Sequence, residues 1–391
     1  MHRSAHFSSP RAAALVAAAL VAAVLLLPSA PGQQGIKREG NAWTRTYTAT
    51  MSALPRLRIE AHGPVTLDSS AASSIEYTVK LVVTAQDEAD AKRMLERVEV
   101  RAIRANGALT LLPPPGRVGS VTWVKAPRLD AATIVTTEGG VNVHSVDGTL
   151  DVEAVGDLHV DRVGGDCSLY TGGGEVKLGQ MGGRLRCTTR AGRIEVRSAK
   201  GESTLTTDGG DIVGWQMGAP VTAHTGAGNV LIVAASGNVD ASTGGGEIQV
   251  VRAGGMVTAR NMLGPVTVGG AAGVQCENAT GGIRVGNVTG PMRIATAMGS
   301  IMASLMGSRI ADSLLATANG DITVAIPSNV GVTVRADNEL SDTMRRITTE
   351  FSSIRVRRQG THLVADGPVN GGGPVLQIAA AGGTIYIRRQ H

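Results

Sequence analysis

The sequence is poor in aromatic residues. Its 391 residues include 3 Trp, 4 Tyr and 2 Phe, which together make 2% of the chain. A globular domain of this size normally uses aromatic rings to fill its core. The core must therefore be built mainly from Val, Ile, Leu, Ala and Met, which suits a narrow, repetitive interior rather than a wide one.

Cysteine and net charge are also scarce. The three cysteines, Cys167, Cys187 and Cys276, are an odd number, which in an exported protein prompts a search for one bridge and one spare thiol. The formal net charge is +5, and it falls to +3 once a leader containing Arg3 and Arg11 is removed. A net charge this small gives no reason to expect nucleic acid as a partner.

Long apolar runs are absent except for one near the amino end. Arg3 and Arg11 precede an uninterrupted apolar run at 12–27, and Pro28 breaks it before the small residues "SAPG". This layout predicts a secretory signal peptide at 1–32, cleaved after Gly32, with an uncleaved anchor as the alternative. The mature protein is then expected to have no integral membrane span and to be exported, to the periplasm, the cell envelope or surface, or the medium.

Glycine is abundant, with 52 residues, and its pattern is periodic. The stretch "TGGGEVKLGQMGG" at 171–183 resembles a phosphate-binding loop, but a near-copy, "TGGGEIQVVRAGG", lies at 243–255. A phosphate loop is needed once, whereas this unit recurs along half the chain. Threonines lie at steps of 18 residues, each three residues before a glycine, at Thr171, Thr189, Thr207, Thr225 and Thr243.

A second glycine column divides each unit into halves of nine residues. After each glycine, apolar and polar residues alternate, as in "GEVKL", "GRIEV" and "GEIQV". Alternation indicates strands with one face inward. Repetition without helical segments predicts an all-β chain, a parallel β-solenoid whose rungs of two strands stack on one another. The glycines are expected at corners where the backbone conformation disfavours side chains.

The glycine column from Gly140 to Gly320 predicts about ten rungs of 18 residues. The threonine column, continued by Asn261, is expected to form a hydrogen-bonded ladder at one corner. The cysteines fall at inward positions, Cys276 only if the register slips by one residue near Gly273. We therefore expect three free thiols that act as small core residues.

The pattern also divides the chain. After the signal peptide at 1–32, residues 33–47 are expected to be a linker. Residues 48–135 are expected to be an N-terminal β-rich cap with one helix, within "DEADAKRMLERV". The solenoid should occupy 136–330, and 331–391 should supply C-terminal cap strands that cover its open end.

These motifs resemble the bacterial putative-adhesin or toast-rack family of β-strand-repeat domains, which is related to auto-transporter adhesin head domains. The resemblance rests on the units "TGGGEVKL", "TRAGRIEV", "TDGGDIVG" and "TGGGEIQV", the closing "TANGDITVAIPSNVGVTVRAD" and the terminal "NGGGPVLQIAAAGGTIYIRR". It covers most of residues 48–391. The family is a domain of unknown function that shares a scaffold, so the resemblance implies no catalytic residues.

An enzyme is the main alternative, since β-helix enzymes act on polysaccharides. Such a site needs two or three carboxylates close together. Glu175 and Glu247 occupy equivalent positions but lie four rungs apart, and the outward columns carry no acidic ladder. The alternative function is a carbohydrate-active β-helix enzyme acting on an envelope or extracellular polysaccharide. Because no such carboxylate cluster is predicted, we expect that the protein is not an enzyme.

The spacing of Asp and His residues also argues against a metal site. A calcium roll repeats Asp in one register, whereas the shaft's aspartates lie in different registers at Asp166, Asp208, Asp211 and Asp240. His144, His159 and His224 share no column and pair with no cysteine, so no metal site is expected. The arginines near the end alternate with acidic residues, which favours solvated strand faces over a binding patch.

The sequence therefore predicts an exported, non-enzymatic β-solenoid that acts as a structural or interaction module of the bacterial cell envelope, in an adhesive or sensory role. We expect no catalytic, cofactor-binding or metal residues and no cofactor. The expected partner is an envelope or surface component, either protein or polysaccharide.

Overall fold

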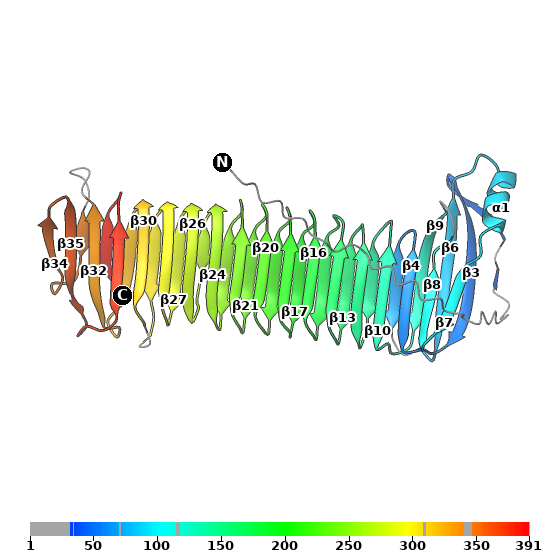
Figure 1. Ribbon diagram of the computed structural model, residues 1–391, viewed down its shortest axis with the longest axis horizontal. Helices are drawn as coiled ribbons and strands as arrows, with labels where there is room; N and C mark the ends of the chain where they lie inside the picture. Colours follow the sequence, from blue (N-terminus) through cyan, green and yellow to red (C-terminus); the bar gives the residue numbers. More distant parts are fainter. Residues whose placement is uncertain are drawn as a thin grey trace, which may run out of the picture.

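The structure is a computed structural model that describes residues 32–33, 35–69, 72–114, 118–307, 310–339 and 346–390. It confirms the predicted parallel β-solenoid: two long sheets lie back to back, and the chain passes from one to the other after nearly every strand of the shaft (Figure 1). The signal peptide expected at 1–32 lies outside the described residues except for Gly32. Within the described ranges, no helix is long and apolar enough to cross a membrane.

Sheet A, the 19-stranded sheet, holds the odd-numbered shaft strands. Its parallel strands are β5 (Val65–Ser69), β11 (Val141–Ser145), β13 (Leu158–Val163), β15 (Val176–Met181), β17 (Ile194–Ala199), β19 (Ile212–Met217), β21 (Val230–Ala235), β23 (Ile248–Ala253), β25 (Val266–Val268), β27 (Ile283–Val288), β29 (Ile301–Leu305), β31 (Ile322–Pro327), β37 (Ile385–Gln390) and β33 (Ile347–Thr349).

Sheet B, the 18-stranded sheet, holds the even-numbered shaft strands. Its parallel strands are β8 (Ala108–Leu112), β4 (Arg56–Ala61), β10 (Ala131–Thr136), β12 (Thr149–Ala154), β14 (Cys167–Thr171), β16 (Leu185–Thr189), β18 (Ser203–Thr207), β20 (Val221–Thr225), β22 (Val239–Thr243), β24 (Met256–Leu263), β26 (Gly273–Thr280), β28 (Met292–Met298), β30 (Ser313–Asn319), β36 (Val375–Ala380) and β32 (Val332–Glu339).

Eleven rungs run in chain order from β10–β11 to β30–β31, against about ten predicted. Their register is the predicted one: Val176 lies beside Ile194 and Leu178 beside Val196 in sheet A. All four side chains are buried, because alternate residues of each strand point between the sheets. The slip near Gly273 is also present, since Ala259 pairs with Cys276 and places that thiol in the core.

The main glycine column has a different cause from the one expected. Gly174, Gly192 and Gly210 do not have a positive φ, so backbone conformation does not require glycine there. A Cβ atom at any of them would lie within 3.0 Å of the backbone of the preceding rung's glycine. These glycines are needed because successive corners stack without space for a side chain. Only from Gly264 onward does the column also have positive φ.

The threonine column forms a ladder that runs through glycine backbones rather than from one threonine to the next. The Thr207 hydroxyl donates to the Gly192 carbonyl at 3.0 Å and accepts from the Gly210 amide at 3.1 Å. Thr171, Thr189, Thr225 and Thr243 make the same pair of contacts. Each buried hydroxyl therefore joins two rungs and satisfies two backbone groups.

The N-terminal end of the stack is antiparallel. In sheet A, β3 (Ala42–Ser52) pairs with β6 (Ser74–Val83), β6 pairs with β9 (Gly119–Ala126), and β9 runs parallel to β5. The short strands β1 (Gly32–Gln33) and β2 (Lys37–Glu39) pair with β3, so residues 33–47, expected to be a linker, contain β2 and part of β3. In sheet B, β7 (Arg101–Ala105) pairs with β8.

The predicted helix is α1 (Glu88–Glu96), which begins after Asp87. The Asp87 carboxylate accepts the Asp90 amide at 2.8 Å, as expected for an N-cap. Ala91 and Leu95 are buried, and Arg45 on β3 donates to the Leu95 carbonyl at 3.0 Å. The helix therefore packs against the terminal antiparallel strands, at the right end of the view in Figure 1.

The C-terminal end departs from chain order. The last two strands, β36 and β37, form a rung that lies between β30–β31 and β32–β33 in both sheets. Figure 1 shows this red rung between the yellow and orange strands. Asp312 and Asp321 accept the backbone amides of Val375 and Thr384 at 2.8 and 2.7 Å, which attaches the rung to its neighbour. Beyond β32, the antiparallel strands β35 (His362–Val369) and β34 (Arg355–Gln359) end sheet B.

Candidate functional site

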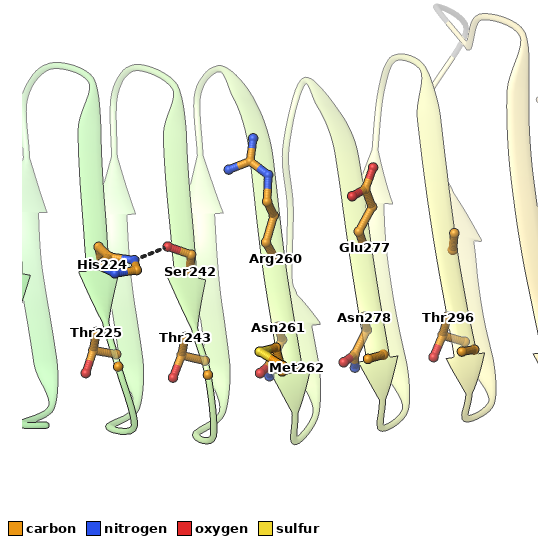
Figure 2. Close-up of a pocket in the computed structure, with 15 residues that line it drawn as sticks. His224, Thr225, Ser242, Thr243, Arg260, Asn261, Met262, Glu277, Asn278 and Thr296 are labelled. Carbon is orange, nitrogen blue, oxygen red and sulfur yellow. Dashed lines mark hydrogen bonds between the residues drawn. The ribbon is translucent and has the colours of Figure 1, made fainter. Parts of the chain in front are cut away.

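A shallow groove of about 730 Å³ crosses the outer face of sheet B from β20 to β28 (Figure 2). It lies beside the corner that holds the threonine column. Its residues come from equivalent positions at the ends of five successive strands, so the repeat itself places them together. They include the buried corner column as well as outward side chains.

Small residues form the groove. The outward position that follows the corner column is Gly226 on the first strand, then Gly244, Met262, Ala279 and Ala297 on the next four. Earlier rungs carry Arg190 and Asp208 at the same position. Glycine and alanine leave space above the sheet where longer side chains would fill it, and this substitution of small for large residues creates the depression.

Polar side chains follow one edge of the groove. Register places His224, Ser242, Arg260 and Glu277 in one row across neighbouring strands. The His224 Nδ1 atom lies 2.6 Å from the Ser242 hydroxyl, and Arg260 forms a 3.1 Å ion pair with Asp240. The row thus presents an imidazole, a guanidinium and a carboxylate that are all exposed.

The other edge is apolar. Met262 lines the groove and is 65% exposed, and Leu263 and Met298, which lie just outside its lining at the same corner, are 56% and 54% exposed. Such exposure is unusual for large apolar side chains. Leu263 and Met298 flank Thr280 in one register row, so they lie two strands apart. Apolar and polar side chains thus lie on opposite sides of the groove.

One buried acceptor beneath the groove has no partner. Asn261 and Asn278 continue the corner column, and both donate their amide nitrogens to glycine carbonyls. The Asn261 Oδ1 atom accepts from the Leu263 amide at 3.2 Å, whereas the Oδ1 atom of Asn278 is buried without a hydrogen bond. The corner is therefore less completely hydrogen-bonded here than in the threonine rungs.

Two histidines that share no sequence column meet on the outer face of sheet A. His144 Nδ1 and His159 Nε2 each lie 3.0 Å from a different carboxylate oxygen of Asp161. The hydrogen bond from His144 is the largest influence on Asp161 and holds the pKa of that carboxyl below its usual range. Paired residues of β11 and β13 are 17 positions apart rather than 18. The 18-residue spacing in the sequence therefore does not place His144 next to the other two residues, and sequence reasoning missed the trio.

The trio does not have the arrangement of a metal centre. Its carboxylate lies between the imidazoles and bonds to each of them. In the part of the chain that the structure describes, no group of three or more His, Cys, Asp or Glu residues is placed to hold a metal ion.

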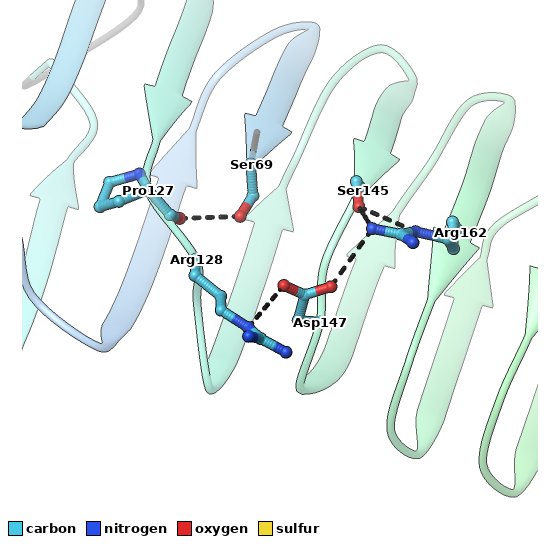
Figure 3. Close-up of polar contacts among 6 residues, drawn as sticks. All are labelled: Ser69, Pro127, Arg128, Ser145, Asp147 and Arg162. Atoms are coloured by element: carbon cyan, nitrogen blue, oxygen red, sulfur yellow. Dashed lines mark hydrogen bonds and ion pairs between the residues drawn. The ribbon is translucent and has the colours of Figure 1, made fainter. Parts of the chain in front are cut away.

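Polar contacts also join the first rungs of the shaft (Figure 3). Asp147 accepts from Arg128 at 2.8 Å and from Arg162 at 3.3 Å, and Arg162 also donates to the Ser145 hydroxyl. The Ser69 hydroxyl donates to the Pro127 carbonyl at 2.8 Å. Exposed pairs of this kind contribute about 0–1 kcal/mol each, so the cluster adds little to stability beyond fastening these loops.

The cysteines are buried and unbridged. Leu169 pairs with Cys187 and Cys167 with Leu185, so these two thiols lie diagonally on adjacent strands. Burial raises the pKa of Cys167 and Cys276 to about 12 and raises the pKa of Cys187 further. All three are therefore un-ionised at neutral pH and poor nucleophiles.

The acidic residues that are candidates for a catalytic or calcium site are spread along the shaft. Glu175 pairs with Lys177 at 2.9 Å just before β15, and Glu247 lies just before β23, four strands further on in sheet A. Asp166 accepts the Arg184 backbone amide at 2.9 Å, and Asp211 accepts that of Asn229 at 2.7 Å. These two aspartates fasten successive rungs, which is a structural use.

The C-terminal arginines are exposed on β34 and at the end of β37. Arg355, Arg357 and Arg358 all face solvent, and Arg357 contacts Asp366. Arg388 and Arg389 lie over the Tyr386 and Phe351 rings at 5.1 and 4.9 Å. Charged residues on a terminal strand discourage pairing with another sheet edge.

No known protein family and no curated protein matches this chain. Among solved structures it is similar to a putative adhesin from Bacteroides fragilis NCTC 9343, at 12% identity over 72% of this chain and 96% of that chain, with a TM-score of 0.25. It is also similar to a putative cell adhesion protein from Clostridium sporogenes ATCC 15579, at 8% identity over 88% and 100%, with a TM-score of 0.16.

A third similar structure is a putative lipid binding protein from Parabacteroides distasonis ATCC 8503, at 14% identity over 73% of this chain and 97% of that chain, with a TM-score of 0.24. Bacterial adhesin-type proteins, the class that the repeat motifs resemble, are thus among the structures similar to this chain.

Proposed function

We propose that this protein is an exported, non-enzymatic β-solenoid of the bacterial cell envelope, and that it binds an envelope or surface component through the groove on sheet B. In this function the shaft is a rigid support and the groove is its contact surface. An adhesive or sensory role follows from holding a partner at a fixed place along that support. The observation that carries the proposal is the groove itself.

The composition of the groove supports binding rather than catalysis. Its polar row combines one guanidinium, Arg260, with one carboxylate, Glu277, and Arg260 is already paired with Asp240. Glu277 is the only carboxylate among the residues that line it. Glycosidic bond cleavage of the common kind uses two carboxylates, one on each side of the scissile bond. An apolar edge with a polar edge opposite it instead provides area and orientation for a partner.

Retention of the purified protein by washed envelopes of the native cells tests the groove. Ala279→Lys places a long charged side chain at its centre and should lower retention by at least about tenfold. Ala318→Lys is the matched control, because Ala318 occupies the same outward position on β30 but does not line the groove. Equal retention of the two variants would contradict binding through this groove.

Two further measurements test the remaining parts of the proposal. Fractionation of native cells should place the protein outside the cytoplasm, and its recovery in the cytoplasm would exclude export. Incubation with purified envelope polysaccharides should release no fragments. Reproducible cleavage that is lost in the Glu277→Gln variant would instead establish the enzyme.

A further inference from the structure

An exposed apolar patch lies on the outer face of sheet A, on the opposite side of the shaft from the groove. Val213 pairs with Leu231 in one outward row, and Trp215, Val233 and Val251 occupy the next outward row of β19, β21 and β23. We call these five residues the Trp215 patch. Trp215 and Val251 are each 44% exposed, Leu231 and Val233 are half-buried, and Val213 is buried beside them. A cluster of apolar side chains on a solvated sheet face marks a contact site.

The Trp215 ring is fixed in place. Its Nε1 atom donates to the Glu195 Oε1 atom at 3.3 Å, and the other carboxylate oxygen of Glu195 lies 3.6 Å from Arg193. The chain has only 3 Trp, so an open indole held by its neighbours is a distinctive feature. A ring that is already oriented loses little conformational entropy when a ligand stacks on it.

Basic and amide side chains border the patch. Arg197 lies across from Trp215 on β17, between two register pairs that join β17 and β19. Arg252 follows Val251 on β23, and Gln249 borders the Val213–Leu231 row. All three side chains are exposed. The patch therefore presents an apolar centre with a guanidinium group at each end and an amide on one side.

We propose that the Trp215 patch binds an acidic polysaccharide of the uronic-acid type. A sugar ring has an apolar C–H face, which stacks on an indole, and hydroxyl groups, which bond to amides and carboxylates. Its carboxylate matches the guanidinium groups of Arg197 and Arg252, since arginine binds carboxylates through paired hydrogen bonds. Strands are about 4.8 Å apart, close to the length of one hexose in an extended chain, so successive sugars meet successive rungs.

Affinity electrophoresis through gels that contain polygalacturonate tests this site, with dextran gels as the neutral comparison. Polygalacturonate should retard the wild-type protein more than dextran does. Trp215→Ala should weaken retardation roughly tenfold, the usual scale for a central aromatic contact. Arg197→Gln and Arg252→Gln should weaken it and reduce its dependence on salt. Trp123→Ala is the matched control, because Trp123 is a 41% exposed tryptophan of the same sheet near the N-terminal end.

Tryptophan fluorescence gives a second measurement on variants that keep an aromatic ring. Polygalacturonate should change the emission of the wild-type protein and of Trp123→Phe, but not that of Trp215→Phe. The groove variant Ala279→Lys should bind polygalacturonate as the wild type does. The proposal for the groove and the proposal for the Trp215 patch can therefore be contradicted independently. The proposal is overturned if polygalacturonate does not retard the wild type at low salt, or if Trp215→Ala and Trp123→Ala are retarded equally.

Discussion

At the scale of single residues, the corner glycines show how a stacked fold restricts its sequence. Gly192 has no side chain because the glycine of the preceding rung already occupies the space where a Cβ atom would lie. Gly209, in the equivalent corner of the next rung, has nothing within 4 Å of the corresponding point. Two glycines in similar turns therefore have different roles, one set by contact with the neighbouring rung and the other by the local turn.

These two positions provide a matched pair of substitutions. Gly192→Ala should destabilise the protein by several kcal/mol, because two stacked backbones must separate to admit the methyl group. Gly209→Ala should change the free energy of unfolding by less than about 1 kcal/mol. Chemical denaturation of both variants checks the difference. Similar losses in the two would mean that stacking does not explain the column.

The buried thiols predict a dependence of stability on pH. Their ordinary pKa is 9.0, and burial raises the pKa of Cys167 and Cys276 to about 12 in the folded protein. Between these values the unfolded chain loses thiol protons that the folded protein keeps, so the free energy of unfolding falls as pH rises. Each thiol contributes up to about 1.4 kcal/mol per pH unit.

Urea denaturation at pH 7, 9 and 10 measures this effect. The wild type should lose more stability over this range than a variant with alanine at Cys167, Cys187 and Cys276, because the variant lacks the three ionisations. Parallel pH profiles for the two proteins would show that the thiols keep their ordinary pKa values.

At the scale of elements, each rung is fastened to the next by polar side chains at its corners. Asp211 accepts the Asn229 amide, and Asn229 in turn accepts the Glu247 amide at 2.8 Å. Short Asp and Asn side chains suit this role because they bond to backbone amides close by. Two of the aspartates that could suggest calcium, Asp166 and Asp211, are used in this way.

The 18-residue period made the rungs, their register and the inward positions predictable. Features that break the period were not predictable. The 17-residue offset between β11 and β13 concealed the His144–Asp161–His159 trio, and the groove depends on side-chain size at a position that the alternation does not restrict. The position of the last rung was not predictable either, because β36 has the same alternating pattern as any other strand. That pattern does not indicate which strands become its neighbours.

The rung formed by β36 and β37, which lies out of chain order, leads to a prediction. Removing residues 371–391 takes away β36 and β37, which among the described strands are the ones that pair with both β30–β31 and β32–β33. Residues 332–369 should then become sensitive to protease while the shaft from β10 to β31 stays resistant. Limited proteolysis followed by mass measurement checks this. Continued protection of 332–369 in the shortened protein would show that the preceding rungs can hold that segment directly.

At the scale of the whole molecule, the stack is held by contacts between neighbouring rungs. Backbone hydrogen bonds, the threonine ladder and an aliphatic core supply these contacts all along the shaft. Stability in such a molecule is close to a sum over rungs and their interfaces. A substitution that destabilises one rung should therefore unfold that rung and its neighbours before it unfolds the whole shaft.

A fold held in this way should not depend on calcium. The far-ultraviolet spectrum should show full β content in the presence of a chelator, and the melting temperature should shift by no more than about 1 °C when calcium is added. In a calcium roll, by contrast, the aspartates repel one another until the ion neutralises them. Loss of β signal in the chelator would require a metal site in the shaft.

The place of the last rung also sets an order of events in time. A polypeptide that leaves the ribosome or crosses a membrane with its amino end first can add rungs one by one up to β31. The next rung in space is the last to arrive, so the segment from β32 to β35 must wait, or move aside, until Gln390 has emerged. The far tip of the shaft can therefore be completed only after β37 has emerged, and a chain interrupted before β36 would carry an open tip that distinguishes it from a chain that contains this rung.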